Sequence, residues 1–161
     1  MDINCKSCRY KHGCKISFGD LDACEHYHPV SSRPSHEEYY LDIAKAVSRR
    51  STCLRRQYGA VIVNNDEIIA TGYNGAPRGC ENCCDIGKCN REGHEHNDGN
   101  YGNCRSVHAE QNAIISASRA EMLGSTLYLA GFENGQAIAA EPCPICKRLI
   151  INAGIKEVIT T

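Results

Sequence analysis

The sequence predicts an α/β fold in which helices flank one mixed sheet, preceded by a short cysteine-rich segment. Three observations support this prediction. Segments with the apolar spacing of helices alternate with short β-type segments, in the order helix, hairpin, helix, strand, helix, strand. Residues 35–161 have the composition of an α/β domain, whereas residues 1–34 have few aliphatic side chains. Cysteine is frequent, with 12 in 161 residues. We therefore predict an N-terminal cysteine-rich module with its linker and a separate α/β domain.

The first elements of the α/β domain are predicted from local signals. Residues 35–50 begin with Ser-His-Glu-Glu, a capping box, and continue with apolar side chains at i, i+3, i+4 and i+7 from Tyr40, which indicates a helix. Residues 59–63 and 67–71 are rich in aliphatic residues and are joined by Asn-Asn-Asp. This pattern predicts a β-hairpin.

The later elements surround a long polar loop. The remaining predicted elements are helices over residues 107–120 and 142–153 and strands over residues 126–130 and 156–160. Asn134 and Gly135 predict a tight turn inside a small hairpin over residues 128–139, and Gly154 is a suitable helix stop. The segment 75–106 is long, polar and almost free of aliphatic residues, which favours a functional loop.

Composition narrows the functional class. The 18 basic and 19 acidic residues nearly cancel, so we do not expect a broad electrostatic surface for nucleic acid. The first residues have no apolar run of a signal peptide and no segment is long enough to cross a membrane, so we expect a cytoplasmic protein. Thiols stay reduced in that compartment, and the abundant cysteines therefore indicate metal binding or catalysis rather than disulfides.

Four residues at two predicted helix starts carry the chemistry. Cys143 and Cys146 lie three positions apart in a first helical turn, where the helix N-terminus favours thiolates. With His108 they provide three ligands for zinc, and three protein ligands leave the fourth position for water, as in catalytic sites. Glu110 lies close enough to exchange protons with that water without binding the metal. The alternative is a structural zinc site completed by a cysteine of the long loop.

These residues resemble a known family. His-x-Glu followed by Pro-Cys-x-x-Cys is the signature of zinc-dependent nucleobase deaminases. Together with residues 59–63, residues 71–77 (Thr-Gly-Tyr-Asn-Gly-Ala-Pro) and the run from His108 to Ile115, it makes residues 35–160 similar to the cytidine and deoxycytidylate deaminase family. The resemblance is strongest to the deoxycytidylate (dCMP) deaminase branch. It implies a three-layer α/β/α cytidine-deaminase-like fold.

The resemblance also implies roles for individual residues. His108, Cys143 and Cys146 would hold the catalytic zinc, and Glu110 would take a proton from the attacking water and pass it to N3 and to the departing amine. The reaction would convert dCMP to dUMP with release of ammonia. Asn74 would contact the sugar or the base edge, although Gly-Tyr-Asn-Gly is also typical of a turn. The backbone of Ala109 would contact the pyrimidine carbonyl.

Phosphate contacts and regulation are further expectations from the resemblance. The candidate phosphate-binding residues are Arg55, Arg56, Arg78 and Arg105, of which we select Arg78, and each has the alternative of a solvated surface arginine. The dCMP branch is also associated with hexamers controlled by dCTP and dTTP, so we expect a homo-oligomer (hexamer or dimer), these two nucleotides as regulators, and Mg2+ with the regulatory nucleotide.

The other cysteines predict two further metal sites. Some dCMP deaminases hold a second, structural zinc in the region of the long loop, and the matching ligands here are Cys53, Cys83, Cys89 and Cys104, with His94 or His96 as substitutes. The alternative is that these thiols are free. Cys5, Cys8, Cys14 and Cys24 form a compact set in a segment without an aliphatic core, so we expect a metal to organise it. Zinc is the first choice, and an iron–sulfur cluster is the alternative.

Other functions fit the same sequence. The substrate could be another small or modified pyrimidine, a nucleoside or a base in RNA. The fold could also serve as a catalytically silent, metal-stabilised binding module. The presence of Glu110 favours an enzyme, because a silent module has no need of that carboxylate.

Overall fold

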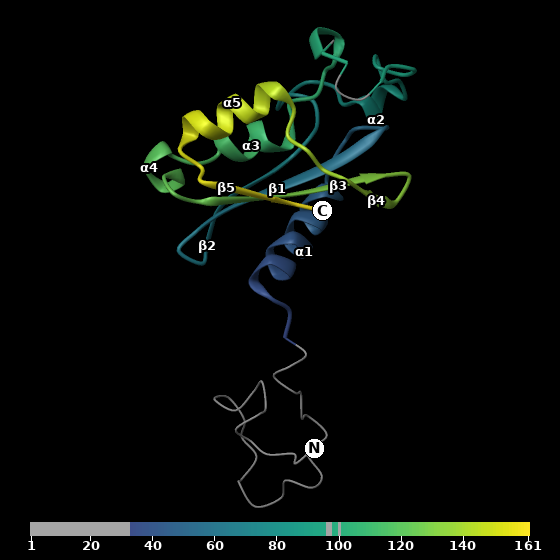
Figure 1. Cartoon of the computed structure of the whole chain (residues 1–161). Coiled ribbons are helices and arrows are strands. Elements are labelled where there is room, and N and C mark those ends of the chain that lie inside the picture. The colour runs from purple at the N-terminus through teal and green to yellow at the C-terminus, as the bar shows by residue number, and fades with distance from the viewer. Residues whose placement is uncertain (1–32, 96–97, 100) are drawn as a thin grey trace, which may run out of the picture. The chain divides into compact units, whose positions relative to one another are not determined.

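The computed structural model describes residues 33–95, 98–99 and 101–161 (Figure 1). The chain divides into two units, residues 1–36 and 37–161, and the second contains the fold described below. The predicted cysteine ligands of the N-terminal module, and His96, lie outside the described residues. Among the described helices, none combines the length and the apolar character needed to span a bilayer.

One sheet of five strands forms the centre of the domain. The strands are β1 (Arg56–Asn64), β2 (Glu67–Tyr73), β3 (Thr126–Glu133), β4 (Gln136–Ile138) and β5 (Glu157–Thr160). They are ordered β2-β1-β3-β4, and β5 also pairs with β3, at the opposite end from β4. The β3–β5 pair is parallel and the other pairs are antiparallel. This confirms the predicted mixed sheet.

Helices cover both faces of the sheet, which confirms the three-layer α/β/α architecture. Helix α1 (His36–Ser48) lies on one face, and α3 (Ala109–Ile115) and α5 (Pro144–Ala153) lie on the other (Figure 1). Alternate residues of β1 supply the two cores, since successive side chains of a strand point to opposite faces. Val61 and Val63 belong to the core under α1, whereas Ala60 and Ile62 belong to the core under α3 and α5.

The predicted helix over residues 107–120 is wrong in extent. Helix α3 ends at Ile115, and a separate short helix, α4 (Arg119–Met122), follows it. Ser118 starts α4, and its Oγ accepts a hydrogen bond from the Glu121 backbone N–H at 3.3 Å. A serine side chain that bonds to a nearby backbone group competes with helix continuation, which explains the break. The other predicted helices, strands and hairpins are present.

The long loop contains short helical turns. Helix α2 (Cys83–Ile86) and the 3-10 helix η4 (Tyr101–Asn103) lie within it. The loop is tied to the sheet at both ends by an isolated bridge between Gly75 and Val107, with backbone hydrogen bonds of 3.2 and 2.8 Å. The bridge brings the end of β2 to the residue directly before His108, so the fold joins the loop to the start of α3.

Candidate active site

The starts of α3 and α5 bring three metal-ligating side chains together. His108 directly precedes α3, Cys143 is the N-cap residue of α5, and Cys146 lies in the first turn of α5. The Nδ1 atom of His108 lies 3.5 Å from the Cys143 sulfur and 3.4 Å from the Cys146 sulfur. The three ligand atoms lie within 4.8 Å of one another, and no other group of three such residues does so in the described part of the chain.

These distances fit a zinc ion. With Zn–S and Zn–N bonds of about 2.3 and 2.05 Å at tetrahedral angles, a bound nitrogen and sulfur lie about 3.6 Å apart. The observed separations of 3.4 and 3.5 Å agree with this value. The backbone N–H of Cys146 points to the Cys143 sulfur at 3.5 Å and supports negative charge there. The site can therefore hold zinc through these three residues.

Cys146 needs a cation to become a thiolate. Cys146 is fully buried, and burial, followed by the charge of Glu110, raises the pKa of its thiol. A thiol with a raised pKa stays protonated at neutral pH unless a metal displaces the proton. Metal binding at this site is therefore coupled to proton release.

Glu110 is a buried carboxyl group beside the ligands. It lies in the first turn of α3, and its exposed fraction is 5%. Burial raises the pKa of Glu110, and a hydrogen bond with Cys146 acts in the opposite direction. A carboxyl group with a raised pKa both accepts and donates a proton more readily near neutral pH than an exposed glutamate, which suits a general acid–base.

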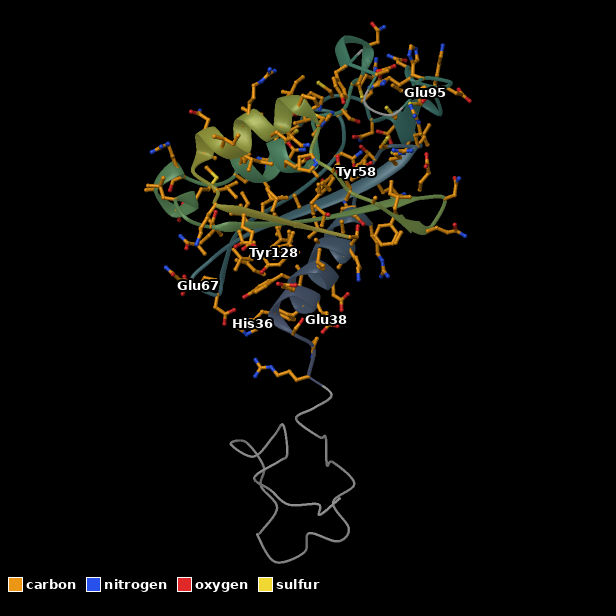
Figure 2. All side chains as sticks on the ribbon, viewed as in Figure 1. His36, Glu38, Tyr58, Glu67, Glu95 and Tyr128 are labelled. Atoms are coloured by element: carbon orange, nitrogen blue, oxygen red, sulfur yellow. The ribbon has the colours of Figure 1, made fainter. Side chains whose placement is uncertain are left out.

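A cavity opens in front of these residues and is closed on one side by the long loop. His108, Ala109, Glu110 and Cys143 line its base. Figure 2 shows that Tyr58 of β1 lies at the loop end of the sheet, below the loop that carries Glu95. Both residues line the cavity. The substrate space is therefore bounded by the sheet, the start of α3 and the long loop.

Asn74 lines the cavity, but its amide group is mostly used within the protein. Its Oδ1 accepts hydrogen bonds from the Tyr58 backbone N–H and the Ser51 hydroxyl, both at 2.7 Å, and its Nδ2 donates to the Arg56 carbonyl at 2.8 Å. An amide has two acceptor positions and two N–H donors, so one N–H remains for a ligand. Asn74 therefore fixes the start of β1 to the end of β2 and keeps one N–H donor available.

The candidate arginines separate into two groups. Arg55 and Arg56 line the cavity, whereas Arg78 and Arg105 are exposed and lie outside its lining. Arg91, which the sequence analysis missed, is a third arginine on the cavity wall. Two of the three already pair with carboxylates.

The ion pairs of the cavity arginines differ. Arg56 pairs with Glu133 at 3.1 Å, and Arg91 pairs with Asp98. Arg55 has no carboxylate partner among the described residues, and its Nη1 donates to the Arg91 carbonyl at 2.9 Å. Of the three arginines that line the cavity, Arg55 is therefore the one whose charge is not neutralised by a described carboxylate.

Three of the four cysteines predicted to bind a second zinc also line the cavity. These are Cys53, Cys89 and Cys104, whereas Cys83 is buried. Burial and then the charges of the other three raise the pKa of Cys83, so these groups lie within electrostatic reach of it. In the described residues no three of the four sulfur atoms lie within 4.8 Å of one another.

Arg91 and Tyr101 are cavity residues that the sequence analysis missed. Arg91 follows Cys89 by two positions and Tyr101 precedes Cys104 by three, so proximity to a predicted ligand was the available signal. The polar loop has no periodicity that assigns its side chains to a face.

Fold and ligand set together define the class as a zinc-dependent deaminase. The sequence model of the family described as "Cytidine and deoxycytidylate deaminase zinc-binding region" matches residues 34–161. The chain belongs to the cytidine and deoxycytidylate deaminase family, and the enzymes of that name are hydrolases.

The most similar relatives include deoxycytidylate deaminases. The enzyme of Mycobacterium phage D29 is 37% identical over 134 residues, which cover 80% of this chain and 95% of the relative. The enzyme of Schizosaccharomyces pombe is 36% identical over 144 residues, covering 86% of this chain but 41% of the relative. The crystal structure of the dCMP deaminase from cyanophage S-TIM5 in complex with dCMP and dUMP is similar, with a TM-score of 0.56 and 32% identity, covering 80% of this chain and 82% of that one.

Proposed function

We propose that this chain is a deoxycytidylate deaminase, which hydrolyses the 4-amino group of dCMP and yields dUMP and ammonia. The observation that carries the proposal is the convergence of His108, Cys143 and Cys146 beside the buried carboxyl group of Glu110. The deoxycytidylate deaminase relatives and the dCMP- and dUMP-bound cyanophage structure support the substrate.

Zinc held by the three ligands would lower the pKa of a water molecule in the fourth position and so supply a nucleophile near neutral pH. Glu110 has two tasks in the proposal. It accepts the first proton of the attacking water and passes it to N3 of the ring, and it then carries the remaining proton of the C4 hydroxyl to the leaving amino group, so that ammonia departs. Its burial supports both tasks, since the raised pKa brings the two protonation states closer in free energy at neutral pH.

The base and the sugar would be oriented by backbone and amide groups. Ala109 is fully buried at the start of α3 and lines the cavity, where the first backbone N–H groups of the helix are unpaired within the helix and suit the pyrimidine carbonyl. Asn74 would donate its remaining amide N–H to the sugar or the base edge.

The phosphate would bind to Arg55. This arginine lines the cavity without a carboxylate partner among the described residues, so it offers an unneutralised charge to a dianionic phosphate. The sequence-based choice of Arg78 stays a prediction, and its exposed position outside the cavity lining makes it the weaker candidate.

A second, structural zinc would hold the long loop through Cys53, Cys83, Cys89 and Cys104. The electrostatic influence of the other three cysteines on Cys83 and the absence of an aliphatic core in the loop support this proposal. The third metal site at the N-terminal cysteines, the oligomer, the regulation by dCTP and dTTP with Mg2+ and the cytoplasmic location stay predictions from the sequence.

A substrate panel tests the proposed function. Ammonia release is measured from dCMP, CMP, deoxycytidine and dCTP at equal concentrations, and the product is identified by chromatography. We expect the highest kcat/KM for dCMP, with dUMP as the product. Activity on deoxycytidine alone would assign a nucleoside deaminase, and no ammonia from any of the four would overturn the proposal.

A further inference from the structure

Tyr101 connects the long loop to the metal ligands. Its ring contacts the His108 imidazole edge to face, with the ring centroids 5.3 Å apart and an interplanar angle of 72°. Its hydroxyl lies within hydrogen-bonding reach of the Cys143 sulfur. A phenol is protonated at neutral pH, so this hydroxyl can donate to the sulfur. One side chain therefore contacts two of the three zinc ligands.

Arg91 supports Tyr101 from the loop side. Its guanidinium carbon lies 5.1 Å from the centroid of the Tyr101 ring, a cation–π arrangement. Arg91 is 7% exposed, pairs with Asp98 and donates to the Glu95 carbonyl at 3.0 Å. These contacts hold the guanidinium in place, and the guanidinium in turn restricts the Tyr101 ring.

We propose that Tyr101 is a positioning residue for the catalytic zinc ligands, which orients His108 through its ring and Cys143 through its hydroxyl. The inference deepens the zinc-binding part of the proposed function. Partners of this kind fix the orientation of metal ligands, and their loss commonly lowers metal affinity by about 10- to 100-fold. Because Arg91 lies behind the ring, the conformation of the long loop is linked to the geometry of the metal site.

Two variants separate the contributions of hydroxyl and ring. Tyr101→Phe removes only the hydrogen bond to sulfur, and Tyr101→Leu also removes the ring. Zinc retention by the purified holoenzyme is measured against increasing concentrations of a chromogenic chelator. The His108→Ala variant should lack the catalytic zinc, so the difference between its zinc content and that of the wild type identifies the zinc of the catalytic site. We expect that zinc to be lost at roughly tenfold lower chelator concentration in Tyr101→Phe, and lower still in Tyr101→Leu.

A second readout reports the ligand field directly. In the cobalt-substituted enzyme, the thiolate-to-cobalt absorption band assigned to the catalytic site should shift in Tyr101→Phe. Tyr39→Phe, on the exposed part of α1, is the matched control and should change neither readout. A change at the catalytic site in either readout supports the proposal, and wild-type values in both overturn it.

Both readouts are independent of substrate. A chain that releases no ammonia from dCMP would overturn the proposed function and still leave the role of Tyr101 open to this test. If Tyr101→Leu does not fold, Tyr101→Phe alone decides, since it preserves the ring and its packing.

Discussion

Gly72 of β2 and Ala109 of α3 are in direct backbone contact: a Cβ atom on Gly72 would lie 2.3 Å from the Ala109 carbonyl oxygen and 2.3 Å from the Ala113 backbone nitrogen. Any side chain larger than hydrogen would therefore push α3 away from the sheet. His108 and Glu110 lie at the start of α3. The close approach at Gly72 therefore determines the distance between these two residues and the sheet.

Gly72→Ala should destabilise the protein and weaken the metal site together. Overpacking against backbone atoms costs about 3 kcal/mol in the free energy of unfolding, which urea denaturation measures. Zinc retention should fall as well, since α3 carries one of the ligands. Gly102→Ala is the control, because no atom lies within 4 Å of a Cβ at that position. Equal stability of the two variants would contradict the assigned contact.

The Tyr40–Asp66 hydrogen bond should make stability depend on alkaline pH. The Tyr40 hydroxyl donates to Asp66 Oδ1 at 2.5 Å and fixes α1 to the turn between β1 and β2. This bond, followed by burial, raises the pKa of Tyr40 from 10.0 to about 12. The folded state therefore holds the proton more tightly, so the stabilisation is complete below pH 10 and is lost as the pH rises from 10 to 12.

The comparison of Tyr40→Phe with the wild type isolates this contribution. At pH 8 the variant should be less stable by about 2 kcal/mol. At pH 11 the difference in the free energy of unfolding should be smaller, because Tyr40 ionises in the unfolded wild type while the folded state still holds the proton. Tyr39→Phe, with its side chain half exposed, should show no such trend. A difference that stays constant with pH would refute the assignment.

Arg55 should determine the preference for a nucleotide over a nucleoside. Arg55→Gln removes the cavity charge, so the KM for dCMP should rise by about tenfold or more while kinetics with deoxycytidine stay unchanged. Arg78→Gln is the matched control and tests the sequence-based choice. A raised KM for dCMP in Arg78→Gln, together with a wild-type KM in Arg55→Gln, would show that Arg78 binds the phosphate instead.

Cys83 should be required for a second bound zinc. It is the buried member of the four loop cysteines, so Cys83→Ser should lower the zinc content by one atom per chain and lower the melting temperature. Cys80→Ser, at an exposed cysteine of the same loop, should keep the wild-type zinc content. A wild-type zinc content in Cys83→Ser would contradict the second zinc site.

The elements that sequence reasoning predicted are those with local physical signals. Asn134 and Gly135 have φ values of 51° and 78°, as the tight turn of the small hairpin requires, and Gly154 ends α5 at a φ of 86°. The His108 and Cys143 ligands were found for the same reason, because each begins a helix within a short motif.

The parts that sequence reasoning missed depend on contacts between distant residues. The Arg55–Arg91 hydrogen bond joins residues 36 positions apart, and the loop that carries Arg91 has no periodicity from which to infer its partners. The break before α4 was different, since Ser118 and Glu121 form a capping box that was visible in the sequence and competed with the longer helix.

The most direct test of the account is the activity of Glu110→Gln on dCMP, measured together with its zinc content. Glutamine has almost the same shape but accepts no proton, so kcat should fall by about 100-fold or more while the zinc content stays at the wild-type value. Glu67→Gln, at an exposed carboxylate of β2 outside the cavity lining, is the control and should retain activity. Wild-type turnover of dCMP by a zinc-loaded Glu110→Gln variant would contradict the assignment of Glu110 as the proton-transfer group.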